Sequence, residues 1–225
     1  MEESLRRSAA HIWVDDVDAP APDDEATHHL RRVLRLRDGA AVSVTDGVGA
    51  WRACRLVGHD LESVAPVIRE DQPRWPITIL AAAPKGDRVE WMVQKCTEVG
   101  VDRIVVLTAE RSVMRWEDER AARNMDRLRR IAVEAALQSR RVWFPVVEGP
   151  TPAATILAGA VIAELGGRQL DVGDRSVAVG PEGGWTPGEL RLAGDHVELG
   201  NNVLRVETAA VVAANRLVML RDDPW

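Results

Sequence analysis

The sequence predicts an α/β protein in which a small, mostly β domain precedes a larger domain built on a mainly parallel sheet. Three observations lead to this prediction. Short segments of alternating apolar and polar residues occupy the first 70 or so positions, and residues 71–76 are polar with two prolines. From residue 77 onward, apolar strand-like segments alternate with helical ones. A chain of 225 residues is long enough to hold a small domain beside a medium one.

The first domain is predicted from a hairpin pattern. Residues 41–45 and 51–57 each alternate apolar and polar side chains, and Asp46 and Gly47 between them are a turn signal. The two prolines within residues 71–76 are typical of a linker. We therefore predict a β domain over residues 1–72 and a second domain over residues 73–225.

The second domain begins with a strand, a helix and a further strand. Residues 77–83 form a continuous apolar run, which is typical of a buried strand. Asp87 and Glu90 resemble a capping box, and Gly100 is a typical helix end. The apolar residues of this helix fall on one face, namely Val89, Met92, Val93, Cys96 and Val99. Residues 103–108 are predicted as the next strand.

A long helix and a series of strands follow. Residues 117–140 show helical periodicity, with most arginines facing outward. Thr186 and Glu189, with proline between them, predict a capped helix start. The last helix, residues 207–220, is apolar on most sides and is therefore expected between layers or at a subunit interface. Strands are predicted at residues 160–165, 176–179 and 196–199.

Composition excludes several classes of protein. Hydrophobic residues make up 46% of the chain and charged residues 28%, which is too apolar for intrinsic disorder. We expect a cytoplasmic protein with no membrane span, because no signal-like apolar segment follows the N-terminus and no apolar run approaches roughly 20 residues. Cys54 and Cys96 are the two cysteines, and we expect both to be buried free thiols.

The charge distribution leaves two interpretations open. A net charge of -6 argues against a protein that coats nucleic acid indiscriminately. Four arginines nevertheless lie within residues 31–37, and residues 111–141 contain nine arginines against five acidic residues. These clusters are either local nucleic-acid-binding surfaces or solvated faces of a chain that uses arginine almost throughout in place of lysine.

Two loops near the C-terminus carry the pattern most typical of a binding site. Residues 180–184 are rich in glycine and follow a predicted strand, and open α/β sheets bind ligands at the carboxyl ends of their strands. Residues 200–206 leave the next strand and enter the last helix. We expect the two loops to lie side by side and to enclose a flat heterocycle. The sequence has neither a dinucleotide fingerprint nor a P-loop, which argues against nucleoside triphosphates.

Six segments follow one another along the chain as recognisable motifs: His28–Gly39, Lys85–Gly100, Glu110–Ser112, Glu134–Ser139, Gly180–Gly184 and Leu204–Ala209. In this order they resemble the RsmE family of SPOUT methyltransferases, nearly from end to end. Members of that family methylate N3 of a uridine in 16S ribosomal RNA (rRNA) with S-adenosylmethionine (SAM). One departure is Asn201 and Asn202, where family members usually carry proline and another residue.

The resemblance implies a fold and an assembly. A PUA-like RNA-binding β domain is expected over residues 1–72 and a SPOUT methyltransferase domain over residues 73–225. A SAM-binding trefoil knot is expected at about residues 160–220. The family usually forms homodimers, and we expect one here.

The resemblance also implies that the two C-terminal loops bind SAM, with residues 163–165 as a third wall. An adenine ring needs apolar walls and backbone hydrogen-bond partners. The implied cofactor contacts are Ala163, Glu164, Leu165, Gly180, Pro181, Glu182, Gly183, Gly184, Leu199, Gly200, Leu204 and Thr208. Methyl transfer to nitrogen requires no metal, and the sequence contains no His, Cys and carboxylate cluster that suggests one.

Catalytic residues are expected beside this pocket. Methylation at N3 of uridine requires loss of a proton and stabilisation of the charge that develops on the flanking oxygens. Arg205, at the mouth of the second loop, is the candidate for charge stabilisation. Glu182 and Glu207 are the candidates for accepting the proton. The alternative for each carboxylate is a structural one, in which it caps backbone N–H groups at its loop or helix start.

RNA contacts are implied in both domains, and the expected partner is 16S rRNA within an assembled or assembling small ribosomal subunit. In the PUA-like segment they are His28, Arg31, Arg32 and Arg35; in motifs expected on the catalytic domain they are Lys85, Arg88, Arg111, Gln138 and Arg140. Without the resemblance, His28 and His29 would be interpreted as a partly buried structural pair.

Two alternative functions are open at this point. The first is a SPOUT methyltransferase that acts on another RNA, such as the ribose hydroxyl of a tRNA. The second is an RNA-binding relative that has lost catalysis; eroded cofactor loops would mark it, whereas here the glycines and Arg205 are intact.

Overall fold

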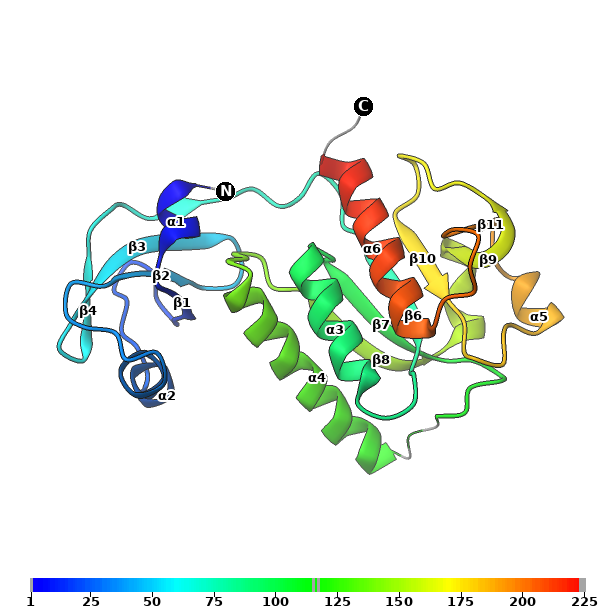
Figure 1. Cartoon of the computed structure of the whole chain (residues 1–225), viewed down its shortest axis with the longest axis horizontal. Helices are drawn as coiled ribbons and strands as arrows, with labels where there is room; N and C mark the ends of the chain where they lie inside the picture. The colour runs from blue at the N-terminus through cyan, green and yellow to red at the C-terminus, as the bar shows by residue number, and fades with distance from the viewer. Residues whose placement is uncertain (1, 115, 117, 223–225) are drawn as a thin grey trace. The chain divides into compact units, whose positions relative to one another are not determined.

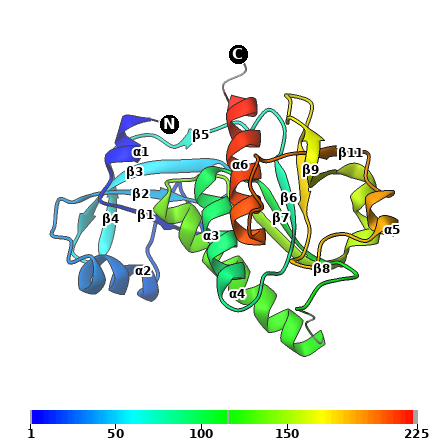
Figure 2. The same ribbon diagram turned by 45° about the vertical axis from the view of Figure 1, so that its right-hand side comes forward.

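The computed structural model describes residues 2–114, 116 and 118–222, and the chain forms two compact units (Figures 1 and 2). The first unit consists of the residues up to Gln72 together with Ala136–Phe144. The second consists of Pro73–Ala135 together with the residues from Pro145 onward. Within the described ranges, no helix is both long enough and apolar enough to cross a membrane.

The first unit is built on a five-stranded sheet in the order β1-β2-β3-β4, with β5 paired to β3. The predicted hairpin is confirmed, because β2 (Ala41–Thr45) and β3 (Ala50–Val57) pair in antiparallel register. Their inward-facing residues, with Leu30 from a helical segment, form a core of their own. The other elements are helix α1 (Glu3–Arg7) and strands β1 (Ala10–Trp13), β4 (Asp60–Ser63) and β5 (Ile68–Arg69).

A helical segment that the sequence analysis did not predict precedes β2. Helix α2 (Asp24–His28) is capped by Asp23, whose carboxylate accepts a hydrogen bond from the backbone N–H of Ala26 at 2.7 Å. It continues as a π-helix over His29–Val33. Leu30 is the one fully buried residue of this π-helix, so the segment lacks the apolar periodicity from which a helix is predicted.

The segment Ala136–Phe144 belongs to the first unit although it is distant from it in sequence. The indole Nε1 of Trp143 donates a hydrogen bond to the carbonyl oxygen of Glu70 at 3.1 Å. The imidazole of His11 lies 3.3 Å from the carbonyl oxygen of Arg141, and burial lowers the pKa of His11 to about 4. His11 is therefore neutral at physiological pH, as a buried structural histidine is expected to be.

The second unit is built on a six-stranded sheet in the order β11-β9-β10-β6-β7-β8, and every pairing in it is parallel. The predicted fold class is thereby confirmed for this unit. The strands are β6 (Thr78–Ala82), β7 (Arg103–Thr108), β8 (Val146–Pro152), β9 (Val161–Arg168), β10 (Ser176–Val179) and β11 (Asp195–Val197).

Helices cover both faces of this sheet. Helices α3, α4 and α6 contribute to a large core on one face, and α3 and α6 lie side by side in Figures 1 and 2. Two short 3₁₀ turns (Ala153–Thr155 and Leu157–Gly159) and the residues near α5 pack on the other face. The helices are α3 (Arg88–Val99), α4 (Asp118–Gln138), α5 (Pro187–Leu190) and α6 (Val206–Asp222).

Some element ends agree with the sequence patterns and others do not. Strands β7 and β10 have the predicted bounds, and α3 ends at Gly100, which has the left-handed φ of 117°. The side chain of Asp87 makes no capping hydrogen bond, so the predicted capping box at the start of α3 was wrong. The predicted first residue of the long helix, Glu117, lies outside the described residues. Strand β8 was missed because its glycine and prolines are unusual in strands.

Candidate active site

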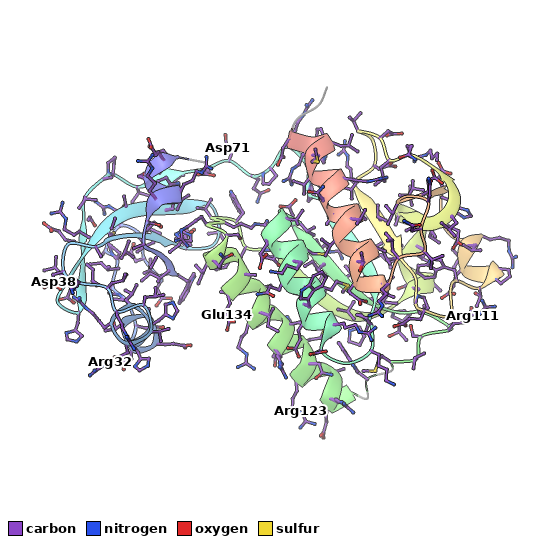
Figure 3. The ribbon with its side chains drawn as sticks, in the orientation of Figure 1. Arg32, Asp38, Asp71, Arg111, Arg123 and Glu134 are labelled. Atoms are coloured by element: carbon purple, nitrogen blue, oxygen red, sulfur yellow. The ribbon has the colours of Figure 1, made fainter. Side chains whose placement is uncertain are left out.

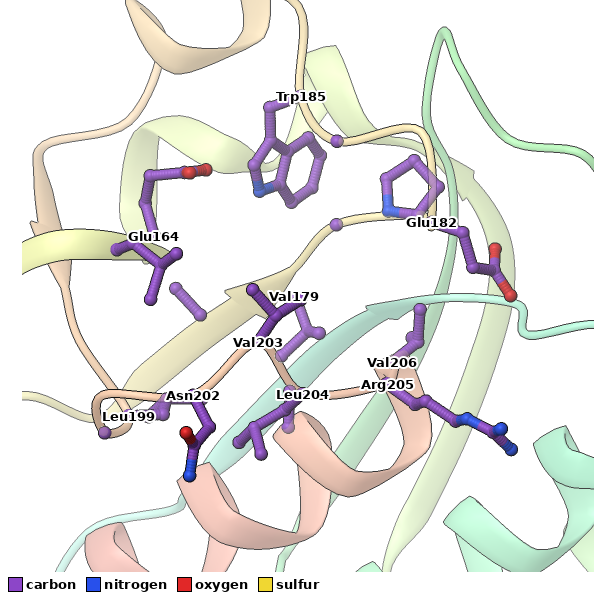
Figure 4. Close-up of a pocket in the computed structure, with 17 residues that line it drawn as sticks. Glu164, Val179, Glu182, Trp185, Leu199, Asn202, Val203, Leu204, Arg205 and Val206 are labelled. Carbon is purple, nitrogen blue, oxygen red and sulfur yellow. The ribbon is translucent and has the colours of Figure 1, made fainter.

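A pocket of about 400 Å³ opens at the carboxyl ends of the strands β10 and β11 and beside residues 163–165 of β9 (Figure 4). This volume is typical of small-molecule sites. Three segments line it: residues from β9, the loop that follows β10, and the loop between β11 and α6. Strand β9 lies between β10 and β11 in the sheet, so the two loops face one another across β9 instead of following neighbouring strands.

The third segment results from an irregularity in β9. Its register against β11 passes from Ile162, which faces His196, directly to Arg168, which faces Val197. The intervening residues 163–167 therefore leave the regular ladder, and the first three of them line the pocket. A bulge of this kind is common next to binding sites because it redirects side chains and backbone.

The structure brings most of the predicted cofactor contacts together. Ten of the twelve line the pocket: Ala163, Glu164, Leu165, Gly180, Pro181, Glu182, Gly184, Leu199, Gly200 and Leu204. Gly183 and Thr208 are outside its lining. The predicted catalytic residue Arg205 lines it as well, and six lining residues were not predicted: Val179, Trp185, Asn202, Val203, Val206 and Ala209.

Trp185 forms a wall of the pocket and packs against Gly180. A Cβ atom on Gly180 would lie 2.8 Å from Nε1 and Cε2 of the indole, so only glycine allows this approach. The indole is 5% exposed, and its Nε1 has no hydrogen-bond partner among the described residues. An unpaired buried donor beside a pocket is stabilised by a ligand that supplies an acceptor.

The loop between β11 and α6 presents backbone groups that are free to bind a ligand. None of the N–H groups of residues 200–205 donates a hydrogen bond to another residue in the described part of the chain. Asn202 lines the pocket, and the side chain of Val203 is 86% exposed at its edge. Free N–H groups beside apolar side chains are suited to a heterocycle such as adenine.

Arg111 holds the glycine-rich loop in place. Its guanidinium Nη1 donates hydrogen bonds to the carbonyl oxygens of Gly183 and Trp185, both at 3.2 Å. Gly183 faces this arginine, because a Cβ on it would lie 3.1 Å from the Cβ of Arg111. We had expected Arg111 to contact RNA; in the structure its guanidinium contacts the loop.

A buried carboxylate makes a second link to the same loop. Glu189 is 2% exposed, and its Oε1 accepts a hydrogen bond from the backbone N–H of Glu110 at 2.9 Å. Its Oε2 accepts from the N–H of Thr186 at 2.9 Å, while the Thr186 hydroxyl accepts from the N–H of Glu189. The capping box predicted at this position is thus confirmed. The two links together brace the loop against residues 110–111.

Two charged side chains reach one side of the pocket. Figure 4 shows Arg205 and Glu182 extending on the same side, away from Glu164 and Asn202. Both are exposed, and neither makes a hydrogen bond or an ion pair through its side chain with another described residue. The structural alternative for Glu182, in which it caps backbone N–H groups, is therefore not observed.

Glu207 is placed differently. It lies in the first turn of α6, is 7% exposed and is outside the lining of the pocket. Its Oε1 lies 3.8 Å from Nε of Arg88, and its Oε2 has no hydrogen-bond partner within the described residues. It caps no backbone N–H group there. Arg88 thus faces Glu207, whereas Lys85 is exposed.

Three of the four predicted RNA contacts in the first unit are on its surface. His28, Arg32 and Arg35 are exposed, and Figure 3 labels Arg32, which lies in the π-helix that follows α2. His29 is exposed too, so the interpretation of a partly buried histidine pair was wrong.

Arg31 differs from these neighbours because its guanidinium is used internally. It donates hydrogen bonds to the carbonyl oxygen of Leu36 at 2.9 Å, to Asp38 and to the carbonyl oxygen of Gly58. The hydrogen bond from Arg31 lowers the pKa of the Asp38 carboxyl. These contacts hold the loop that carries Arg35, which has a left-handed φ of 54°.

Gln138 lies at the end of α4 and Arg140 directly after it, in the segment Ala136–Phe144 that packs with the first unit. Gln138 is exposed. Arg140 donates hydrogen bonds to the carbonyl oxygens of Ser8 at 2.8 Å and Leu137 at 3.1 Å. Burial lowers the pKa of Arg140, and its Nε has no partner among the described residues. Its guanidinium therefore has a structural role within the first unit.

The remaining expectations concern cysteines and metals. Cys54 and Cys96 are buried free thiols, as predicted, and burial raises the pKa of Cys96 to about 12. No group of three or more His, Cys, Asp and Glu side chains suited to a metal ion occurs in residues 2–114, 116 and 118–222.

Two family models match the chain, and named relatives are similar to it over most of its length. A model described as an RNA methyltransferase domain matches residues 70–218, and one described as an RNA methyltransferase PUA domain matches residues 22–64. Two relatives are named ribosomal RNA small subunit methyltransferase E. That of Mycobacterium bovis is 33% identical over 88% of this chain and 85% of its own length, and that of Synechocystis is 32% identical over 87% and 71%.

Solved structures with bound SAM are similar over nearly the whole chain. The small subunit methyltransferase E of Neisseria gonorrhoeae, bound to SAM, has a TM-score of 0.75 and 27% identity, covering 94% of this chain and 97% of its own. A Legionella pneumophila methyltransferase in complex with SAM has a TM-score of 0.77, 26% identity and the same coverages. With its PUA-like β domain, its parallel-sheet methyltransferase domain and its matched motifs, the chain belongs to the RsmE family of SPOUT methyltransferases.

Proposed function

We propose that this protein is the SAM-dependent methyltransferase that modifies N3 of a uridine in 16S rRNA, within an assembled or assembling small ribosomal subunit. The observation that carries the proposal is the pocket at the carboxyl ends of β10 and β11 and beside residues 163–165, with Arg205 and Glu182 at one side of it. Relatives that are similar over most of the chain are named as small-subunit rRNA methyltransferases, and two similar structures contain SAM.

The pocket fits SAM in three respects. Its apolar walls, including Trp185 and Leu204, suit an adenine ring, and the N–H groups of residues 200–205 are free to donate to it. The unpaired Nε1 of Trp185 is a further donor. The carboxylate of Glu164, on the side away from Arg205, is suited to accept hydrogen bonds from ribose hydroxyls. Gly183 and Thr208 lie outside the lining of the pocket, and the carbonyl oxygen of Gly183 accepts a hydrogen bond from Arg111.

When bound, SAM supplies the methyl group. The protein's part is then to hold the uridine and to manage charge at N3. Arg205 presents a free guanidinium whose planar donors match a uracil oxygen that becomes negative as the N3 proton leaves. Glu182 extends on the same side of the pocket and accepts the proton. Buried Glu207 instead orients Arg88 at the start of α3.

Several further features complete the proposal. We assign the SAM-binding trefoil knot to about residues 160–220 and a homodimeric assembly to the enzyme. The domain limits are residues 1–72 and 73–225, with residues 136–144 returning to the first domain. Substrate RNA is held by the exposed His28, Arg32, Arg35, Lys85 and Gln138, while Arg31 and Arg140 shape the surface. The enzyme works in the cytoplasm, where small subunits are assembled.

The nucleoside product tests the proposal. Purified protein is incubated with SAM and small subunits that lack the modification, and the digested rRNA is examined by nucleoside mass spectrometry. N3-methyluridine is the expected product. A ribose-methylated nucleoside from this or another RNA would establish the alternative SPOUT activity. Absence of both products, with SAM bound in calorimetry, would leave an RNA-binding relative that has lost catalysis.

Replacing Arg111 with alanine tests the brace on the glycine-rich loop. Since the guanidinium holds two carbonyl oxygens of that loop, its loss is expected to raise the Kd for SAM about tenfold, or ~1.4 kcal/mol. The Kd for rRNA is expected to stay at its original value. Calorimetry with SAM and filter binding with rRNA measure the two constants. If rRNA binding weakens while SAM binding does not change, Arg111 is an RNA contact.

A further inference from the structure

Four arginines follow the exposed face of α4 in the second unit. Arg120, Arg123, Arg127 and Arg130 are spaced three and four residues apart and are all exposed. The opposite face of the helix is buried in the core. At 1.5 Å per residue, the four positions span roughly 15 Å along the helix. Figure 3 shows Arg123 on the outer side of α4, with Glu134 nearer its other end.

Three of these arginines lack a partner among the described residues, and we call Arg120, Arg123 and Arg130 the basic stripe. Arg127 is different, since it forms an ion pair with Glu90 of α3 at 2.8 Å. Asp126 is an acidic neighbour on the helix, but its carboxylate pairs with Arg129 at 2.8 Å. No ion pair within the described chain involves Arg120, Arg123 or Arg130.

The four arginines repel one another along the helix. Like charges three or four residues apart on a helix repel one another, and the four arginines make three such pairs. Glu119, Asp126 and Glu134 also lie three or four residues from these arginines, but of the three only Asp126 forms an ion pair within the described chain, and its partner is Arg129. The unusual concentration occurs in a chain whose net charge is -6. A polyanion bound along α4 would relieve the repulsion.

We propose that the basic stripe is a docking surface for the phosphate backbone of the substrate rRNA; the proposal rests on the function assigned above. Guanidinium groups bind phosphate oxygens through paired, charge-assisted hydrogen bonds. A row of them at helical spacing contacts successive phosphates without reading bases. A second copy of the chain is a poorer occupant, because a two-fold interface over this face would set arginines against arginines.

A triple variant, Arg120→Gln, Arg123→Gln and Arg130→Gln, tests the surface in the full-length protein. Its affinity for protein-free 16S rRNA is measured over a series of salt concentrations. Loss of three phosphate contacts is expected to weaken binding at least tenfold at low salt. It should also reduce the slope of log K against log salt by about 2, at ~0.7 per contact with a single strand. The Kd for SAM should equal that of the unaltered protein.

Two control variants separate local contacts from general charge. Lysine at the same three positions keeps the charge and should keep most of the affinity and the salt slope. A second triple variant, Arg55→Gln, Arg69→Gln and Arg103→Gln, changes the net charge equally but removes arginines that already face carboxylates. It should bind rRNA as the unaltered protein does.

Three results would overturn the proposal. The first is an unchanged salt slope in the glutamine variant, and the second is an equal loss in the lysine variant. The third is unchanged binding to naked rRNA with weaker binding to whole subunits, which would assign the surface to an acidic ribosomal protein. These three results concern RNA binding and do not depend on which nucleoside is methylated. Failure of the proposed function is detected separately, by nucleoside mass spectrometry of rRNA treated with the unaltered protein.

Discussion

Replacing Arg205 with alanine is expected to lower kcat about 10²–10³-fold, the usual effect of removing a donor that stabilises developing negative charge. The Kd for SAM should change by less than about threefold, because the loop around Arg205 offers backbone groups that the substitution leaves in place. In the proposed mechanism the Arg205 guanidinium, at one side of the pocket, stabilises charge on the uracil oxygens as the N3 proton leaves, so its loss affects turnover more than SAM binding. Single-turnover methylation and calorimetry measure the two effects.

Two variants make the test of Arg205 specific. Arg205→Lys keeps the charge but loses the planar donors, so it should recover only part of the rate. Arg191→Ala removes an exposed arginine outside the pocket and should leave kcat unchanged. If Arg205→Ala weakens SAM binding as strongly as it slows turnover, the arginine holds the cofactor loop and does not stabilise charge.

The position of the pocket was predictable because local patterns specify it. Strand β10 ends where its apolar run ends, and Gly180 directly after it allows the approach of Trp185. The order of the strands was not predictable from these patterns. Strand β9 lies between β10 and β11 in the sheet. The periodicity of a segment indicates whether it is a strand or a helix, but it does not indicate which other strand it pairs with.

Side-chain roles were harder to predict than positions. Arg31, Arg111 and Arg140 lie in basic motifs, yet their guanidinium groups bind carbonyl oxygens of their own chain. The same guanidinium donors bind either phosphate oxygens or backbone carbonyl oxygens. A basic cluster in a sequence therefore does not distinguish an arginine that contacts nucleic acid from one that stabilises the fold. Only the geometry around each guanidinium distinguishes them.

Replacing Gly180 with alanine is expected to raise the Kd for SAM at least about tenfold and to destabilise the fold by ~1–3 kcal/mol, the usual cost of overpacking. The added Cβ would lie 2.8 Å from two atoms of the Trp185 indole. That indole is buried and forms a wall of the pocket, so either the ring or the glycine-rich loop must move. Both movements distort the cofactor site. Calorimetry with SAM and thermal unfolding measure the two losses.

A matched control and a compensating change show whether the contact with Trp185 is the cause. Gly194→Ala adds a Cβ where no other heavy atom lies within 4 Å, so it should leave SAM binding and stability unchanged. Trp185→Leu in the Gly180→Ala background removes the ring atoms Nε1 and Cε2 that the Cβ meets at 2.8 Å, and it should restore part of the lost stability. If Gly180→Ala alone binds SAM with its original affinity, the approach of loop and indole does not shape the pocket, and the glycine is there for the turn alone.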